Sequence, residues 1–421
     1  MKKPFFLLLL SFLVLISCSS DDDNPANPPD SMMSDDDDPP VVVDDDTQNS
    51  GPCESGSAGG FPCNGYDLLG RISLGEFNAN GGNDIWGWTD PMTSREYALV
   101  GLDNGTAFVD ITDEANLVYL GKLPTATTPS GWRDIKVYQD HAYVVSEAAD
   151  HGMQVFDLTR LRDVTDPPVN FTADNRYTGI GNSHNIVINE ATGYAYPVGT
   201  NREDAFSGGV HFINIQDPKN PVAAGGYGGS GYTHDAQVVT YNGPDADYAG
   251  SEIFIGANET SVVIVDITDK DNPALITGTN YPSTAYTHQG WFTEDQRYFI
   301  LGDEIDEINF GFNSRTLVFD LSDLDSPTLH ATYLGPTQAI DHNGYVKADQ
   351  YFLANYTAGM RVLDISGIAD ETIVEEGFFD TVPGNDQTNF SGVWSVYPYF
   401  ESGKIVLSDM NSGLFVIRAS N

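Results

Sequence analysis

The chain has 421 residues, of which 61 are Asp or Glu and only 19 are Lys or Arg, so its formal net charge is −42 at pH 7. A surface this acidic argues against nucleic acids and anionic lipid headgroups as partners, because both are themselves anionic. It suits solubility and leaves room for divalent cations.

The first residues are typical of an export signal. Lys2 and Lys3 precede an apolar run over residues 5–16, which is too short to span a bilayer comfortably as a helix. The run ends in Leu15-Ile-Ser-Cys18, which looks like the lipobox that is cut before a cysteine that becomes acylated. We predict a lipoprotein signal peptide over residues 1–18 and lipidation of Cys18. The alternative is an ordinary secretory signal that ends in a cysteine by chance.

An acidic spacer follows the signal. Ser19–Asp23 resembles the acidic signal that some gram-negative bacteria place after the lipid-bearing cysteine to send a lipoprotein to the outer face. Residues 1–50 contain eleven aspartates, and from Asp21 onward large apolar side chains are almost absent, so this segment cannot bury a core. We predict a disordered tether over residues 19–50. We also predict an outer-membrane protein that faces the extracellular side and touches the membrane only through its lipid.

The folded part begins with the two remaining cysteines. Cys53 and Cys63 flank the glycine-rich segment Glu54–Pro62 and form a pair in an oxidising compartment. We predict a disulfide between them, which stabilises a loop this short by roughly 2–3 kcal/mol in the chain-entropy description. Neither cysteine has a second Cys or His at zinc-finger spacing, so a structural zinc is not favoured.

A repeat of about fifty residues runs through the rest of the chain. Strand-like runs, most of them ending in Asp followed by Ile or Leu, recur seven times: Gly105–Thr112, Met153–Leu158, Val210–Ile215, Val262–Ile267, Thr316–Leu321, Met360–Ile365 and Gly413–Arg418. Three further short apolar runs surround each copy, and no long window has a helical period. Seven units of four short strands predict an all-β fold, a seven-bladed β-propeller over residues 51–421.

The two ends of the repeat predict how the ring closes. The last unit stops after its third strand at Ile417, whereas the folded part begins with an unpaired strand-like segment, Tyr66–Gly75. We expect this segment to complete the last blade, because an open strand edge would invite unwanted pairing.

The folded part of the sequence resembles a known family. Val262-Val-Ile-Val-Asp266 is similar to the LVIVD repeat, and residues 51–421 resemble the choice-of-anchor B group of propeller proteins. The resemblance rests on segments such as Cys53–Leu69, Trp86–Trp88, Trp132–Lys136, His151–Phe156, Ser183–Asn185, Tyr232–Asp235, Tyr286–Trp291, Asp303–Glu307, Phe390–Trp394 and Tyr397–Phe400. It implies a propeller body carried on an anchor. It transfers no catalytic residue, because no activity is settled for the group.

Four histidines recur in the repeat at one position. His184, His234, His288 and His342 are spaced 50, 54 and 54 residues apart, at the start of the predicted inner strands of blades three to six. Their side chains should gather at one mouth of the central channel. The loops between second and third strands place acids on the same face: Asp103, Glu147, Glu203, Glu259, Asp303, Glu304 and Asp409.

Imidazoles with carboxylates beside them are ligands for transition metals. The candidate set comprises His184, His234, His288, His342, Glu147, Glu259, Asp303 and Glu304, with iron, copper, zinc or calcium as the cation. The alternative is structural: equivalent positions repeat their residue because the geometry repeats, and the histidines would bridge neighbouring blades by hydrogen bonds.

Three functions follow from these features. The first is a monomeric surface module that binds an extracellular protein, glycan or small molecule on one propeller face. The second is a metal-dependent, redox-active enzyme with its metal on the four histidines, and the third is a scaffold that only presents surface. No Walker A, Gly-x-Ser-x-Gly, HExxH or CxxC motif points to another activity.

Overall fold

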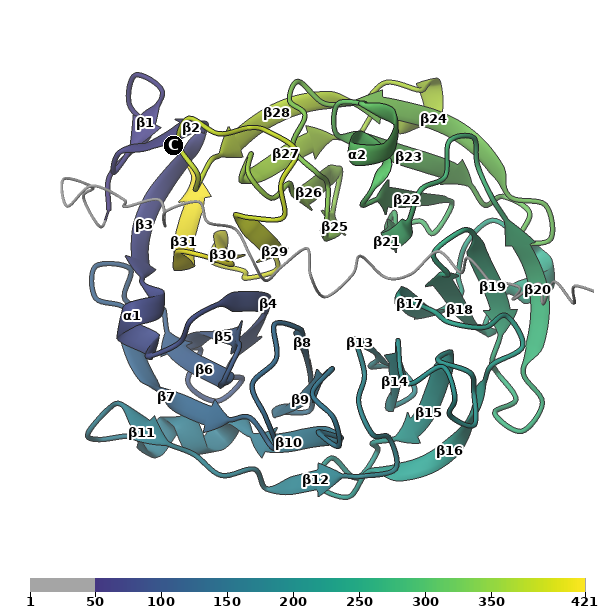
Figure 1. Ribbon diagram of the computed structural model, residues 1–421, viewed down its shortest axis with the longest axis horizontal. Helices are drawn as coiled ribbons and strands as arrows, with labels where there is room; N and C mark the ends of the chain where they lie inside the picture. Colours follow the sequence, from purple (N-terminus) through teal and green to yellow (C-terminus); the bar gives the residue numbers. More distant parts are fainter. Residues whose placement is uncertain (1–49, 421) are drawn as a thin grey trace, which may run out of the picture. The chain divides into compact units, whose positions relative to one another are not determined.

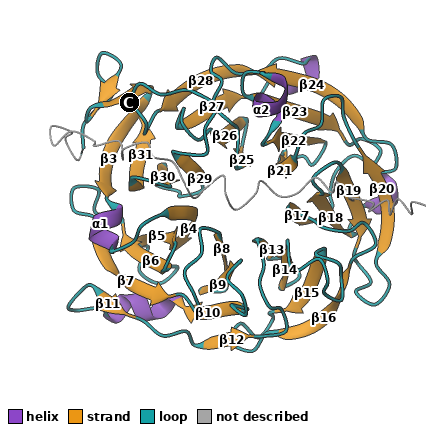
Figure 2. Cartoon of the chain, viewed as in Figure 1, coloured by secondary structure: helices purple, strands orange, loops and turns teal. Residues whose placement is uncertain are grey.

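The structure is a computed structural model that describes residues 50–420. Over this range the chain is an all-β, seven-bladed propeller whose blades surround a central channel (Figure 1). Strands dominate, and helices occur only as short segments between them (Figure 2). The predicted signal peptide, the lipidation site at Cys18 and all of the tether up to residue 49 lie outside the described residues. Within the described range, no helix is long and apolar enough to cross a membrane.

The first four blades follow the chain in order, from the innermost strand outward. Blade 1 consists of β4 (Gly82–Thr89), β5 (Glu96–Leu102), β6 (Gly105–Asp110) and β7 (Val118–Pro124), with β11 (Val169–Asn170) parallel on its outer edge. Blade 2 consists of β8 (Arg133–Tyr138), β9 (His141–Ser146), β10 (Met153–Asp157) and β12 (Asn175–Tyr177). Blade 3 consists of β13 (Asn185–Asn189), β14 (Tyr194–Val198), β15 (Val210–Asn214) and β16 (Val222–Tyr227). Blade 4 consists of β17 (Asp235–Thr240), β18 (Glu252–Ala257), β19 (Val262–Asp266) and β20 (Ala274–Thr279).

The last three blades complete the ring. Blade 5 consists of β21 (Thr287–Phe292), β22 (Tyr298–Asp303), β23 (Arg315–Asp320) and β24 (Thr328–Leu334). Blade 6 consists of β25 (Gly344–Lys347), β26 (Gln350–Ala354), β27 (Met360–Asp364) and β28 (Val374–Phe379). Blade 7 consists of β29 (Val393–Tyr397), β30 (Lys404–Asp409), β31 (Gly413–Ala419) and β3 (Tyr66–Ile72). The helical segments are α1 (Leu74–Phe77), α2 (Asp306–Phe310), η2 (Leu158–Asp163), η3 (Ala246–Tyr248) and η4 (Ile368–Asp370).

The recurring aspartate of the repeat ends the third strand of most blades. Its side chain turns back and accepts a hydrogen bond from the backbone N–H two residues further on. This bond is 2.9 Å long for Asp110 and Asp266 and 2.8 Å for Asp320 and Asp364. Such a turn stops the strand and starts the connection to the fourth strand. The sequence repeat therefore reflects a turn that each blade needs.

The predicted closure of the ring is confirmed. Strand β3 pairs antiparallel with β31, from Tyr66 opposite Ala419 to Ile72 opposite Leu414. The strand ends at Ile72 rather than continuing to Gly75, because Ser73 and Glu76 form a capping box that begins α1.

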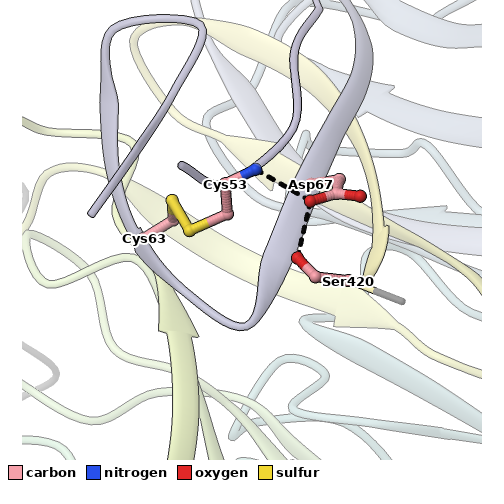
Figure 3. The surroundings of a disulfide bond; sticks show 4 residues. All are labelled: Cys53, Cys63, Asp67 and Ser420. Carbon is pink, nitrogen blue, oxygen red and sulfur yellow. Dashed lines mark hydrogen bonds between the residues drawn. A yellow bond between two sulfur atoms is a disulfide. The ribbon is translucent and has the colours of Figure 1, made fainter. Parts of the chain in front are cut away.

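The N-terminal segment also extends to blade 6, which the sequence analysis did not predict. The hairpin of β1 (Ser57–Ala58) and β2 (Phe61–Asn64) adds to the outer edge of β28, with Cys63 opposite Phe379. The predicted disulfide between Cys53 and Cys63 is present and holds this hairpin. Asp67 of β3 accepts hydrogen bonds from the Cys53 backbone N–H at 2.8 Å and from the Ser420 hydroxyl at 2.5 Å, which joins both ends of the described chain (Figure 3).

Candidate metal centre

The mouth of the central channel is built from equivalent positions of the repeat. Six consecutive blades each place one residue where the inner strand begins. These residues all line one cavity: Arg133, His184, His234, His288, His342 and Trp394. Trp132, Asp84, Asp134, Asn185 and Asn343 complete its lining.

The four histidines form one continuous arc of neighbouring rings. Their ring centroids are 4.1 Å apart for His184 and His234, 4.4 Å for His234 and His288, and 4.3 Å for His288 and His342. Trp394 extends the arc at 4.6 Å from His342. Adjacent blades approach closely at the channel, so a side chain at the same position of each inner strand necessarily meets its neighbour.

Two of the histidines use Nδ1 to bridge to the next blade. His234 donates from Nδ1 to the backbone carbonyl of His288 at 3.3 Å, and His342 donates to that of Trp394 at 2.6 Å. A carbonyl oxygen can only accept, so Nδ1 carries the hydrogen and Nε2 keeps a free lone pair. Metal-binding histidines are commonly oriented by this hydrogen bond. Hydrogen bonds between blades were the structural alternative to a metal site. Because they leave Nε2 free, they are compatible with a metal site.

Glu304 completes a compact group with two of these rings. Its carboxylate oxygens lie 3.6 Å from Nε2 of His288 and 3.6 Å from Nε2 of His342. One ligand atom of each of the three residues lies within 4.8 Å of the other two, and all three side chains are buried. Tyr356 donates to Glu304 at 2.8 Å and holds it in place. Among residues 50–420, this is the one buried set of three such ligand atoms.

The other end of the arc has a different partner. His184 Nδ1 contacts Glu147 at 2.6 Å, so the imidazole at the blade 3 end of the arc is paired with a carboxylate of blade 2. The four histidines therefore do not offer four equivalent ligand atoms at a single point. The predicted set divides into a compact group around Glu304 and a separate hydrogen-bonded pair of His184 and Glu147.

Burial controls the protonation of the arc. It lowers the pKa of His234 and His288 well below the ordinary value and that of His342 to about 3, with the neighbouring imidazoles adding to the effect at His234 and His288. These three rings are neutral at pH 7, as metal ligands must be. At His184 burial acts in the same direction, but the Glu147 carboxylate outweighs it and the pKa is raised. Burial also raises the pKa of Glu304 to about 7.

The remaining predicted acids are occupied elsewhere. Glu259 forms a two-point ion pair with Arg202, at 2.7 and 3.1 Å. Asp303 accepts hydrogen bonds from the backbone N–H groups of Ala285 and Tyr286, both at 2.7 Å, and so shapes the loop that leads to His288. Glu259 and Asp303 were predicted as ligands beside the histidines, but their carboxylates are bonded to Arg202 and to the loop backbone instead.

Further acids of the same loops also hold local structure. Asp103 accepts from Asn80 at 3.1 and 3.2 Å, and Asp409 accepts from Thr381 at 2.6 Å. Glu203 is exposed. These three residues are absent from the lining of the cavity.

Arg133 and Trp394 occupy the same position of the repeat as the histidines but were not among the predicted site residues. Arg133 precedes His184 by 51 residues and Trp394 follows His342 by 52, close to the spacing of the histidines themselves. The spacing alone could have identified both positions, although their residue types differ from histidine.

Fold and site together define a seven-bladed β-propeller with a histidine-lined cavity at the mouth of its channel. No model of a known protein family matches the chain, and no curated protein matches it.

Proposed function

We propose that this protein is a metal-dependent propeller that binds one divalent transition metal through His288, His342 and Glu304. The observation that carries the proposal is the convergence of two neutral imidazoles and one carboxylate, with one ligand atom of each within 4.8 Å of the other two. Two histidines and one carboxylate suit iron, zinc or copper and leave coordination positions open. Both histidines also contribute to the lining of the cavity.

Metal binding requires the three ligand atoms, which lie within 4.8 Å of one another, to move closer together. Ligand atoms at about 2.0–2.1 Å from one metal ion are separated from each other by roughly 3 Å when adjacent. The Nε2 to carboxylate distances of 3.6 Å in this structure are near that value. An open position together with iron or copper would give redox chemistry, whereas zinc would act as a Lewis acid.

Elemental analysis tests the metal site directly. Protein purified without a histidine tag and loaded separately with Zn²⁺, Cu²⁺ and Fe²⁺ should retain about one equivalent of one metal after dialysis. The double variant His288→Ala, His342→Ala should lose it, because two of the three ligands are gone. Glu304→Gln should weaken retention at least tenfold, because it removes the charged ligand.

A matched control is provided by two histidines outside the cavity. The double variant His211→Ala, His330→Ala should retain the metal, and circular dichroism should show all variants folded. Failure of the wild type to retain any of the three metals would refute the proposal. The propeller fold is compatible with a binding module, which would then be the remaining function for the cavity.

We also propose that the chain is lipid-anchored at Cys18 and exposed on the outer membrane. The Lys-rich start, the lipobox-like segment and the acidic residues behind it support this location. The disulfide between Cys53 and Cys63 is consistent with export to an oxidising compartment.

Substitution of the lipidated cysteine tests the anchor. Cys18→Ser should move the protein from the membrane fraction to the soluble fraction or leave it unprocessed, while thermal unfolding of the propeller stays unchanged. Protease treatment of intact cells should degrade the wild-type protein. A processed Cys18→Ser protein that stays in the membrane fraction would show that another feature anchors it.

A further inference from the structure

The cavity contains a buried guanidinium without a counter-ion. Arg133 is 1% exposed. Its Nε donates to the Leu102 carbonyl at 3.0 Å and its Nη1 contacts Nε2 of His151 at 3.0 Å. Its Nη2 is buried and has no hydrogen-bond partner among the residues that the structure describes.

The neighbours of Arg133 do not neutralise its charge. His151 Nδ1 lies 3.0 Å from the Gly152 carbonyl and donates to it, so His151 Nε2 is the acceptor for Arg133. Burial and the guanidinium itself lower the pKa of His151 to about 4, which makes this ring a neutral partner. Burial lowers the pKa of Arg133 to about 10, and the more distant carboxylate of Asp103 partly opposes the shift, so Arg133 is charged at pH 7.

The acids that line the cavity already have a cation. Asp134 and Asp84 lie 2.5 and 3.3 Å from Nζ of Lys136. Arg133, by contrast, forms no ion pair within residues 50–420. A buried charge without a partner is costly, and proteins usually pair it or use it to bind a ligand.

We propose that the cavity binds a small oxyanion, a carboxylate or an inorganic ion of similar size, with Arg133 as its anchoring cation. The free Nη2 supplies two N–H donors and the positive charge, the combination that recognises carboxylate and related oxyanions. Trp132 and Trp394 in the lining limit the space, which favours a compact ligand. The inference rests on the proposed function and deepens it, because it names a class of ligand for the cavity that the metal-binding residues His288 and His342 line.

Calorimetric titration with sodium formate and sodium acetate tests this site. The full-length protein is titrated both metal-free and zinc-loaded, in a buffer without other oxyanions. Saturable binding is expected already in the metal-free protein. Arg133→Gln should weaken it at least tenfold, because a charged hydrogen bond is lost. Arg297→Gln is the control, because Arg297 pairs with Asp320 on the surface; its binding should equal that of the wild type.

The outcomes separate this inference from the metal proposal. Arg133-dependent formate binding in a protein that retains no metal would support the anion site and refute the metal site. Metal retention without saturable formate or acetate binding would support the metal site and refute the anion site. Equal binding by the wild type and Arg133→Gln would also overturn the anion site.

Crystallography of the wild type covers the case in which Arg133→Gln does not fold. Bromide is a heavy anion that can be located by its anomalous scattering. After a bromide soak, a peak in contact with Nη2 of Arg133 is expected and would support the inference. Bromide peaks confined to the molecular surface would overturn it.

Discussion

Deletion of residues 51–72 is expected to make the protein aggregate and to abolish cooperative unfolding of the propeller. The deletion removes β1, β2 and β3, and so leaves the edges of β28 and β31 unpaired. It also uncovers the core between blades 6 and 7, where Phe61 is fully buried and its ring centroid lies 5.1 Å from that of Phe415 and 5.9 Å from that of Phe379. Truncating one such phenylalanine costs about 3–5 kcal/mol. The loss of stability expected from removing the whole segment is therefore comparable to the total free energy of unfolding of a domain, which is typically about 5–15 kcal/mol.

Size-exclusion chromatography and thermal unfolding would measure this effect. Phe61→Ala should be an intermediate case, soluble but less stable by about 3–5 kcal/mol in chemical unfolding. Deletion of residues 20–48 is the control and should leave the unfolding of the propeller unchanged. A monomeric protein with unchanged thermal unfolding after removal of 51–72 would show that β3 does not close the ring.

Replacement of Lys136 by methionine should cost about 3–5 kcal/mol at pH 7, because it leaves two buried carboxylates without a cation. Lys136 joins Asp84 of blade 1 to Asp134 of its own blade, and its Nζ lies 4.5 Å from the Trp86 ring centroid. Asp134 in turn accepts from the Ile186 backbone N–H at 2.7 Å, so the network connects three blades.

The stability lost in Lys136→Met should depend on pH in a defined direction. Burial raises the pKa of Asp134 even in the wild type, whereas at Asp84 Lys136 helps to outweigh burial and the pKa is lowered. Without Lys136, both carboxyls would have a higher pKa in the folded than in the unfolded state. The unfolded state then loses these protons first, so the destabilisation grows as the pH rises above about 4 and shrinks on acidification.

Urea unfolding at pH 5 and pH 7 would test this prediction. The triple variant Lys136→Met, Asp84→Asn, Asp134→Asn should recover most of the lost stability, because no buried charge remains. Lys219→Met is the control: Lys219 pairs with Asp157, its side chain is 50% exposed, and its loss should cost less than about 1 kcal/mol. A Lys136→Met protein with the stability of the wild type at pH 7 would mean that the ion network does not hold the blades.

The fold could be predicted from the sequence because each blade repeats the same local requirements. The alternation of short apolar runs and the aspartate after the third strand are local signals, and their seven copies set the number of blades. The incomplete last unit likewise indicated the partner of β3. The attachment of β2 to blade 6 carried no such signal, because an outer edge accepts any strand that the chain brings to it.

The histidine arc was predictable for the same reason: one position per repeat necessarily forms a ring around the channel. The choice of ligands was decided only by the tertiary structure. Glu304 and Asp303 are adjacent in sequence, yet Glu304 lies beside His288 and His342 while Asp303 bonds to the loop backbone. Glu259 meets Arg202 instead. Loop side chains have no period to fix their direction, so contacts between blades select which carboxylates join the histidines and leave Arg133 without a counter-ion.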